Sequence, residues 1–177
     1  MITTDKDFLR QVSTDCSLEE SESIFEKLEI EIKKHDNALG LSAIQIGIPK
    51  RAFVMWEQNY HQNRDKKILH FLNPKIVELD EPIAESYESC FSLPEYYVKL
   101  KRYEQVTQED EINGKSVLYQ DESIIFQHEF DHLNGILIID KKDRIVIRQP
   151  LENLNIERNK PCTCGSGKKA KRCCYKD

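Results

Sequence analysis

Two histidines with a glutamate beside the first could hold a metal ion in the segment FQHEFDHLNG, residues 126–135. His128 and His132 are four residues apart, so on a helix they share one face and can bind one ion. Glu129 could take a proton from metal-activated water and pass it on. The spacing predicts a hydrolytic metal site, and such a site usually has a third protein ligand.

The identity of the third ligand separates the classes of metal hydrolase. A metzincin protease would have a third histidine where Ile138 stands, so this class is excluded. A thermolysin-like protease would use a glutamate about twenty residues downstream. Glu152 lies there, but in a polar segment with no helical pattern. Cys90, within AESYESCFSLPEY, is the other candidate, because a thiolate and two imidazoles leave a fourth position open for water.

Local patterns predict two helices. A capping box in Ser17–Glu20, followed by apolar residues at every fourth position, predicts an amphipathic helix over residues 18–35. Asp121 is expected to cap a second helix over 122–134, which carries both histidines and ends at Gly135.

Alternating and apolar runs predict the strands of the fold. A break is expected at Asn73-Pro74, and Asn113-Gly114 is a strong signal for a hairpin turn. The order of helix, strands, helix and strand predicts an α+β fold rather than alternating βα units. Strands are expected at residues 52–57, 67–79, 97–112, 115–120, 135–140 and 141–148.

Charge and cysteine usage divide the chain into a body and a tail. Residues 160–177 hold six basic side chains and one acidic one, a balance of +5, so the total of −5 leaves −10 on residues 1–159. An acidic body argues against general or specific DNA binding. No segment has the pattern of a membrane span or secretory signal, so we expect a cytoplasmic protein. Domains are expected at 1–148 and 161–177, joined by a polar linker at 149–160.

Three segments together resemble the motifs of the peptide deformylases. QHEFDHLNG at residues 127–135 matches the family pattern QHExDHLxG, ESCFS at 88–92 matches EGCLS, and ALGLSAIQ at 38–45 matches GxGLAAxQ. The resemblance implies the deformylase-like α+β fold, with mixed or antiparallel sheets around a central HExxH helix. Four positions depart from the family pattern: Ala38 and Ser42 in the first motif, and Ser89 and Phe91 in the second.

The resemblance also implies a role for each matching position. Glu129 would be the general acid and base, while Gln45 and the backbone N–H of Phe91 would bind the oxygen that becomes negative. Glu88 and Arg102 would brace the cysteine loop. The metal ligands would be Cys90, His128 and His132, and the substrate-binding residues would include Gly40, Leu41, Ile44 and Ser89. The metal implied is Fe²⁺, for which Zn²⁺, Ni²⁺ or Co²⁺ can substitute.

The implied reaction removes the N-formyl group from formyl-methionine at the start of nascent peptides and releases formate. Leu41 and Ile44, with Ile124 and Ile125, are candidates for an apolar slot that takes the methionine side chain. Two other interpretations remain open at this point. One is a deformylase-like binding protein with impaired catalysis, and the other is an HExxH zinc protease that uses Glu152.

The segment PCTCGSGKKAKRCC, residues 161–174, has four cysteines around a glycine-rich turn. Four thiolates with no open position are typical of a structural zinc site, and in so short a segment the metal must supply the folding free energy. The segment resembles the SEC-C motif, which implies a zinc knuckle and docking to a protein partner or a ribosome. Its zinc ligands would be Cys162, Cys164, Cys173 and Cys174.

Overall fold

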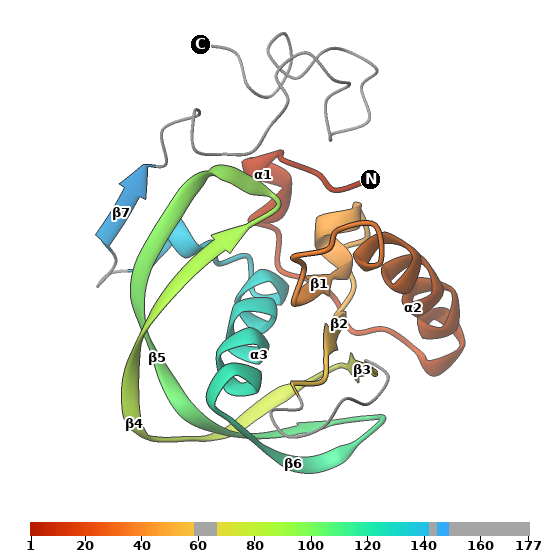
Figure 1. Ribbon diagram of the computed structural model, residues 1–177. Coiled ribbons are helices and arrows are strands. Elements are labelled where there is room, and N and C mark those ends of the chain that lie inside the picture. Colours follow the sequence, from red (N-terminus) through yellow and green to blue (C-terminus); the bar gives the residue numbers. More distant parts are fainter. Residues whose placement is uncertain (59–66, 142–144, 149–177) are drawn as a thin grey trace, which may run out of the picture.

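Helix α3 (Gln120–Leu133), which carries both histidines, lies in the middle of the fold between two antiparallel sheets (Figure 1). The computed structural model describes residues 1–58, 67–141 and 145–148. The predicted α+β class, with its sheets around a central HExxH helix, is confirmed. The predicted linker and zinc knuckle lie outside the described residues.

The first sheet is covered by helix α2 (Leu18–Ile32), which lies beside it in Figure 1. Its capping box is formed as predicted, since the Ser17 hydroxyl accepts from the Glu20 backbone N–H and the Glu20 carboxylate accepts from the Ser17 backbone N–H. The apolar face of α2 packs on the sheet to form one hydrophobic cluster. The strands of this sheet are β1 (Gly40–Ser42), β2 (Ala52–Trp56) and β3 (Ile68–Leu72).

The second sheet is built on a long curved hairpin of β4 (Lys75–Cys90) and β5 (Leu93–Asp110), which passes around α3 (Figure 1). The predicted turn at Asn113-Gly114 joins β5 to β6 (Gly114–Tyr119), and Gly114 has the positive φ (65°) that favours glycine. The last predicted strand is confirmed as β7, which pairs with β5. The strands are β4 (Lys75–Cys90), β5 (Leu93–Asp110), β6 (Gly114–Tyr119) and β7 (Ile145–Arg148).

The prediction for residues 67–79 was incomplete. The chain does break at Asn73, which has a φ of 49°, but β4 then continues to Cys90. Most of β4 is exposed and has no clear apolar alternation. Its strand conformation comes from pairing with β5, which the sequence of β4 alone does not show.

The prediction of a strand over residues 135–140 was wrong. Gly135 has a φ of 68° and closes α3, and Ile138–Asp140 then form the short 3-10 helix η2. The Asp140 carboxylate accepts from the Leu137 backbone N–H (3.1 Å), which stabilises this turn. A side chain at Gly135 would collide with the backbone carbonyl of Arg10, so this corner is tightly packed.

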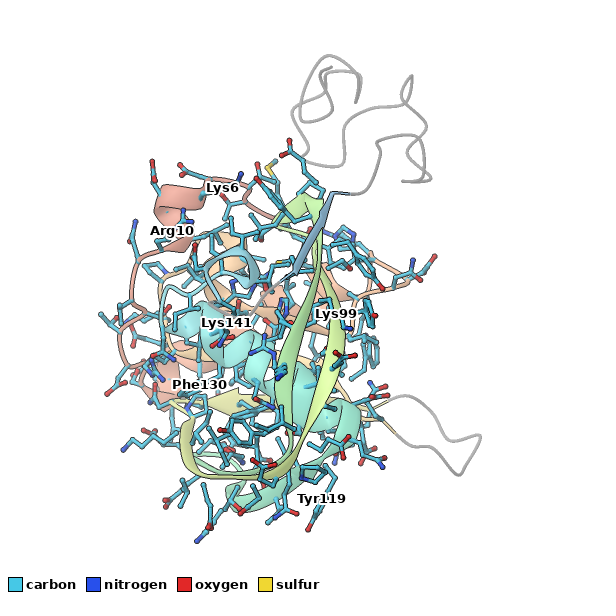
Figure 2. The ribbon with its side chains drawn as sticks, turned by 90° about the vertical axis from the view of Figure 1, so that its left-hand side faces the viewer. Lys6, Arg10, Lys99, Tyr119, Phe130 and Lys141 are labelled. Carbon is cyan, nitrogen blue, oxygen red and sulfur yellow. The ribbon has the colours of Figure 1, made fainter. Side chains whose placement is uncertain are left out.

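The expected cap of α3 was also wrong. The helix begins at Gln120, and the capping position is Tyr119, whose side chain makes no capping hydrogen bond. Asp121 lies inside the first turn, where its negative charge interacts favourably with the helix dipole and stabilises the helix. Figure 2 shows Tyr119 at the end of the molecule opposite Lys6, which belongs to α1 (Lys6–Leu9).

The remaining element is the 3-10 helix η1 (Ala43–Ile46), which follows β1 directly and ends at Gly47. Among the described residues, no helix is both long and apolar enough to cross a bilayer.

Candidate active site

The structure brings Cys90, His128 and His132 together. Their ligand atoms all lie within 4.8 Å of one another, and Cys90 Sγ is 3.3 Å from Nε2 of His132. The two imidazoles come from consecutive turns of α3, with ring centroids 5.0 Å apart. Cys90 is the last residue of β4, next to the turn into β5. The site therefore lies where the hairpin of the second sheet meets the central helix.

The surroundings of Cys90 favour its thiolate form. Burial by itself would raise the pKa of the thiol, but the imidazoles of His132 and His128 outweigh it and hold this pKa well below its usual value. Burial would likewise lower the pKa of His128, yet its contacts with Cys90 and Glu88 raise it well above the usual value. A thiolate beside two ring nitrogens is a donor set that fits a divalent transition metal.

Glu88 fixes the orientation of His128. Its Oε2 lies 2.8 Å from Nδ1 of His128, which leaves Nε2 of that ring for a ligand. Arg102 donates to the same carboxylate twice, from Nε (2.7 Å) and Nη2 (2.8 Å). Burial would raise the pKa of Glu88, but Arg102 and His128 hold it well below its ordinary value. The predicted Glu88–Arg102 pair is thus present and buried.

Two residues of this network were missed by the sequence analysis. Nη1 of Arg102 donates to Oδ2 of Asp131 (2.6 Å), and Nζ of Lys141 lies 2.7 Å from the same carboxylate. Lys141 is beside α3 in Figure 2. Asp131 lies inside the HEFDH segment. It could have been predicted from the fact that a buried arginine, here Arg102, requires negative charges beside it.

Glu129 points a free carboxylate oxygen into the protein. The residue is 3% exposed, and its Oε2 has no hydrogen-bond partner among the described residues. Burial raises the pKa of this carboxyl above its usual value. A buried, unpaired acceptor beside the three ligand atoms is suited to taking a proton from water.

Gly40 lies against Glu129. A Cβ at Gly40 would lie 2.7 Å from Oε1 of Glu129, which is too close. Gly40 is predicted to bind substrate, and the structure adds a requirement that the sequence did not reveal. Its lack of a side chain leaves the space that the Glu129 carboxylate occupies.

The amide of Gln45 is directed at the same site. Its Nε2 lies 3.4 Å from Cys90 Sγ and 3.3 Å from the hydroxyl of Ser92. Its Oε1 accepts two hydrogen bonds from Ser42, one from the backbone N–H and one from the hydroxyl, each 2.9 Å long. The donor end of the amide is therefore held toward the space beside the cysteine.

Phe91 and Ser89 flank Cys90 on the exposed side. The ring of Phe91 is partly exposed and lies 4.8 Å from the ring of His35. Ser89 is exposed and pairs with Tyr97 in the sheet. Within the described part of the chain only Asn73 and Gln120 combine a side chain with a positive φ, so Ser89 has no strained backbone.

The four apolar residues expected to form a methionine slot are not gathered in one cluster. Leu41 packs with α2 and the first sheet, Ile44 packs around Cys90, and Ile125 packs with Phe53 and Phe126. Ile124 is half-buried. Of the four, only Ile44 shares a cluster with a predicted metal ligand.

The fold and the site together define a hydrolase-like α+β protein built on an HExxH helix, and comparisons with known proteins give its family. The polypeptide deformylase family model matches residues 1–147, and the SEC-C motif model matches residues 158–176. The chain belongs to the polypeptide deformylase family, and like its relatives it is an enzyme.

Individual relatives agree with this assignment. A peptide deformylase from Rhizobium meliloti (strain 1021) is 38% identical over 119 residues, which cover 62% of this chain and 67% of the relative. A crystal structure of a probable peptide deformylase from Synechococcus phage S-SSM7 has a TM-score of 0.72 and 29% identity, covering 79% of this chain and 97% of that one. The Thermotoga maritima peptide deformylase structure has a TM-score of 0.66 and 31% identity, covering 80% and 95%.

Proposed function

We propose that this enzyme hydrolyses the N-formyl group of formyl-methionine at the start of nascent peptides, with one Fe²⁺ held by Cys90, His128 and His132. The observation that carries the proposal is the convergence of these three ligand atoms within 4.8 Å of one another. The buried, unpaired carboxylate oxygen of Glu129 lies on the same helix between the two histidines. When bound, the metal would lower the pKa of water and polarise the formyl carbonyl.

Glu129 would move the proton in this reaction. Its carboxylate accepts a proton from the attacking water while the water oxygen forms a bond to the formyl carbon. The C–N bond then breaks, and Glu129 returns the proton to the nitrogen that leaves as the peptide amine. The products are formate and a peptide with a free methionine amino group.

Gln45 and Phe91 would stabilise the charge that grows on the formyl oxygen. The NH₂ group of Gln45 is held toward the site by the two hydrogen bonds from Ser42. The backbone N–H of Phe91, directly after Cys90, would be the second donor. Loss of one such donor typically costs about 2.7–4 kcal/mol of transition-state stabilisation.

The two alternative interpretations have less support. In a binding protein with impaired catalysis we would expect the loss of a ligand, the base or the side-chain oxyanion donor, whereas the sequence retains Cys90, both histidines, Glu129 and Gln45. The protease interpretation needs Glu152, which lies outside the described residues. It also leaves no role for Cys90, whose thiol lies beside both histidines. The match to the deformylase family also weighs against it.

We further propose that the SEC-C motif holds Zn²⁺ through its four cysteines and tethers the enzyme to a ribosome or a protein partner. The match to the motif supports a role in docking, and so does the charge of residues 160–177. Their Lys, Arg and Asp side chains sum to +5, and four thiolates with one Zn²⁺ would leave about +3, which suits an anionic partner. Since nascent peptides leave the ribosome, a tether there would raise the local concentration of substrate in the cytoplasm.

The proposed reaction is tested by formate release from formyl-Met-Ala-Ser. The full chain loaded with Fe²⁺ under anaerobic conditions should release one formate per peptide. Glu129→Ala, loaded in the same way, should be slower by a factor of about 10² or more. If the loaded wild-type protein is as inert as Glu129→Ala, the proposed function is wrong.

A further inference from the structure

Ser42 is one of the positions at which this chain departs from the motif of its family, and its hydroxyl makes a contact that the alanine of the family pattern cannot make. The family pattern GxGLAAxQ has alanine where this chain has Ser42. The Ser42 hydroxyl is fully buried, and it donates to Oε1 of Gln45 over 2.9 Å. An alanine would keep only the backbone hydrogen bond to this oxygen.

The two hydrogen bonds from Ser42 fix which way the Gln45 amide faces. Both lone pairs of Oε1 are used, one by the backbone N–H and one by the hydroxyl. A reversed amide would place its NH₂ group against the Ser42 backbone N–H and would lose the hydrogen bond that the hydroxyl donates to Oε1, so that orientation is disfavoured. The NH₂ group consequently stays on the side of Cys90 and Ser92.

Local structure makes this contact rigid. Ser42 is the last residue of β1 and the N-cap of η1, while Gln45 lies three residues later in that short helix. Gln45 is itself only 2% exposed, so solvent cannot take the place of the hydroxyl. A donor that is already oriented before the substrate binds costs little reorganisation during the reaction.

We propose that Ser42 is a positioning residue for the reaction, acting through Gln45 by holding its NH₂ group where the formyl oxygen becomes negative. This inference rests on the proposed function for its effect on turnover. It does not make Ser42 a catalytic residue, because the hydroxyl contacts Gln45 and not the reacting atoms.

A competing role for the same hydroxyl is to support Glu129, the other acceptor close to it. The two roles differ in their dependence on Gln45. If Ser42 acts through Gln45, its removal matters only while the Gln45 amide is present. If it acts through Glu129, its removal matters equally in both backgrounds.

The test compares Ser42→Ala with wild type, and repeats the substitution in the Gln45→Ala background. We expect Ser42→Ala to lower kcat by about 3- to 10-fold with little change in KM, because the lost interaction counts mainly in the transition state. The same substitution should change kcat by less than about 2-fold in the Gln45→Ala background. An unchanged kcat in Ser42→Ala, or an equal loss in both backgrounds, would overturn the proposal.

Ser42→Cys separates the hydrogen bond from packing, because a thiol has a similar volume but is a weak donor. We expect its kcat to fall as in Ser42→Ala. A Ser42→Cys enzyme with wild-type kcat would show that volume, and not the hydroxyl, is required. Thermal unfolding of each variant shows whether it is folded.

A measurement without turnover tests the same contact. In the metal-free protein, the NMR order parameter of the Gln45 side-chain amide should be lower in Ser42→Ala than in wild type. Equal order parameters would contradict the proposal. If wild-type protein releases no formate, the proposed function fails, while this comparison still decides whether Ser42 holds Gln45.

Discussion

Single residues set the geometry of the site, and Gly40 does so by having no side chain. A Cβ there would lie 2.7 Å from Oε1 of Glu129. We predict that Gly40→Ala displaces this carboxylate and lowers kcat/KM by about 100-fold, since a shift of about 1 Å in a reacting group can have that effect. Cγ and Cδ of Glu129 would also be too close, at 2.9 and 3.0 Å, so the whole buried side chain must turn and the thermal midpoint should fall as well.

Gly114→Ala is the matched control. Gly114 lies in the β5–β6 turn with open space around it, but its φ of 65° is unfavourable for alanine. This variant should lose stability and retain activity, whereas Gly40→Ala should lose activity. A Gly40→Ala enzyme with normal kcat/KM would show that Glu129 does not need this space.

At the residue scale, the sequence predicts those parts of the site that local spacing encodes. The two histidines and Glu129 follow from their periodicity on one helix, and Cys90 follows from its motif. Asp131 and Ser42 could not be assigned in this way. Their roles depend on contacts with Arg102 and Gln45 that only the folded chain brings about.

At the scale of elements, a buried network of charges joins β4, β5 and α3. Arg102 pairs with Glu88 of β4 and Asp131 of α3, and its guanidinium is almost fully buried. We predict that Arg102→Met lowers the free energy of unfolding by about 3–5 kcal/mol, because it leaves two carboxylates in the protein with less compensating charge. Urea unfolding at equal metal loading measures this.

Lys101→Ala is the control for this prediction. Lys101 is the neighbouring residue of β5 and faces solvent, so its loss should change stability by no more than about 0.5 kcal/mol. Similar stabilities for Arg102→Met and wild type would mean that the network does not hold the three elements together.

Helix α2 has its own charged contact near its end, which predicts a pH dependence. Burial would raise the pKa of Glu31, but Lys34 and the amino group of Met1 outweigh it and lower this pKa from 4.5 to about 2. Since the folded-state pKa is the lower one, the contribution to stability is present above about pH 4.5 and is lost as the pH falls toward 2.

Glu31→Gln should therefore be less stable than wild type by roughly 1 kcal/mol at pH 7, because both cationic partners are largely exposed and solvent screens the pairs. The difference should fall to less than half by pH 3, as measured by urea unfolding at both values. Glu26→Gln, on the exposed face of α2, is the control. A difference that grows as the pH falls would contradict the assignment.

Elements with strong local signals could be predicted, and those that depend on partners could not. The capping box of α2 and the Asn113-Gly114 turn are encoded by adjacent residues, and both are found. The extension of β4 to Cys90 requires β5 beside it. The 3-10 helix η2 forms where an apolar run meets the packed corner at Gly135 and Arg10.

At the scale of the whole molecule, the charges of the body and the tail have opposite signs. Residues 1–159 sum to −10, while residues 160–177 sum to +5. We predict that the full chain co-sediments with ribosomes and that deletion of residues 160–177 reduces this binding by about tenfold or more, with a steep dependence on salt.

The same deletion should leave formate release from a free tripeptide unchanged, since the three proposed ligands of the catalytic metal and every proposed catalytic residue lie before residue 133. Ribosome binding that survives the deletion intact would refute the tether. Loss of tripeptide hydrolysis on deletion would show that the tail supports the catalytic body directly.

X-ray absorption at the iron edge of the Fe²⁺-loaded full chain shows which atoms bind the catalytic metal, because zinc absorbs at a different energy. If Cys90, His128 and His132 hold the iron, its ligands include one sulfur and two imidazole nitrogens, and the sulfur is lost in Cys90→Ala. Iron without a sulfur ligand in the wild-type protein, or the same sulfur signal in Cys90→Ala, would contradict it.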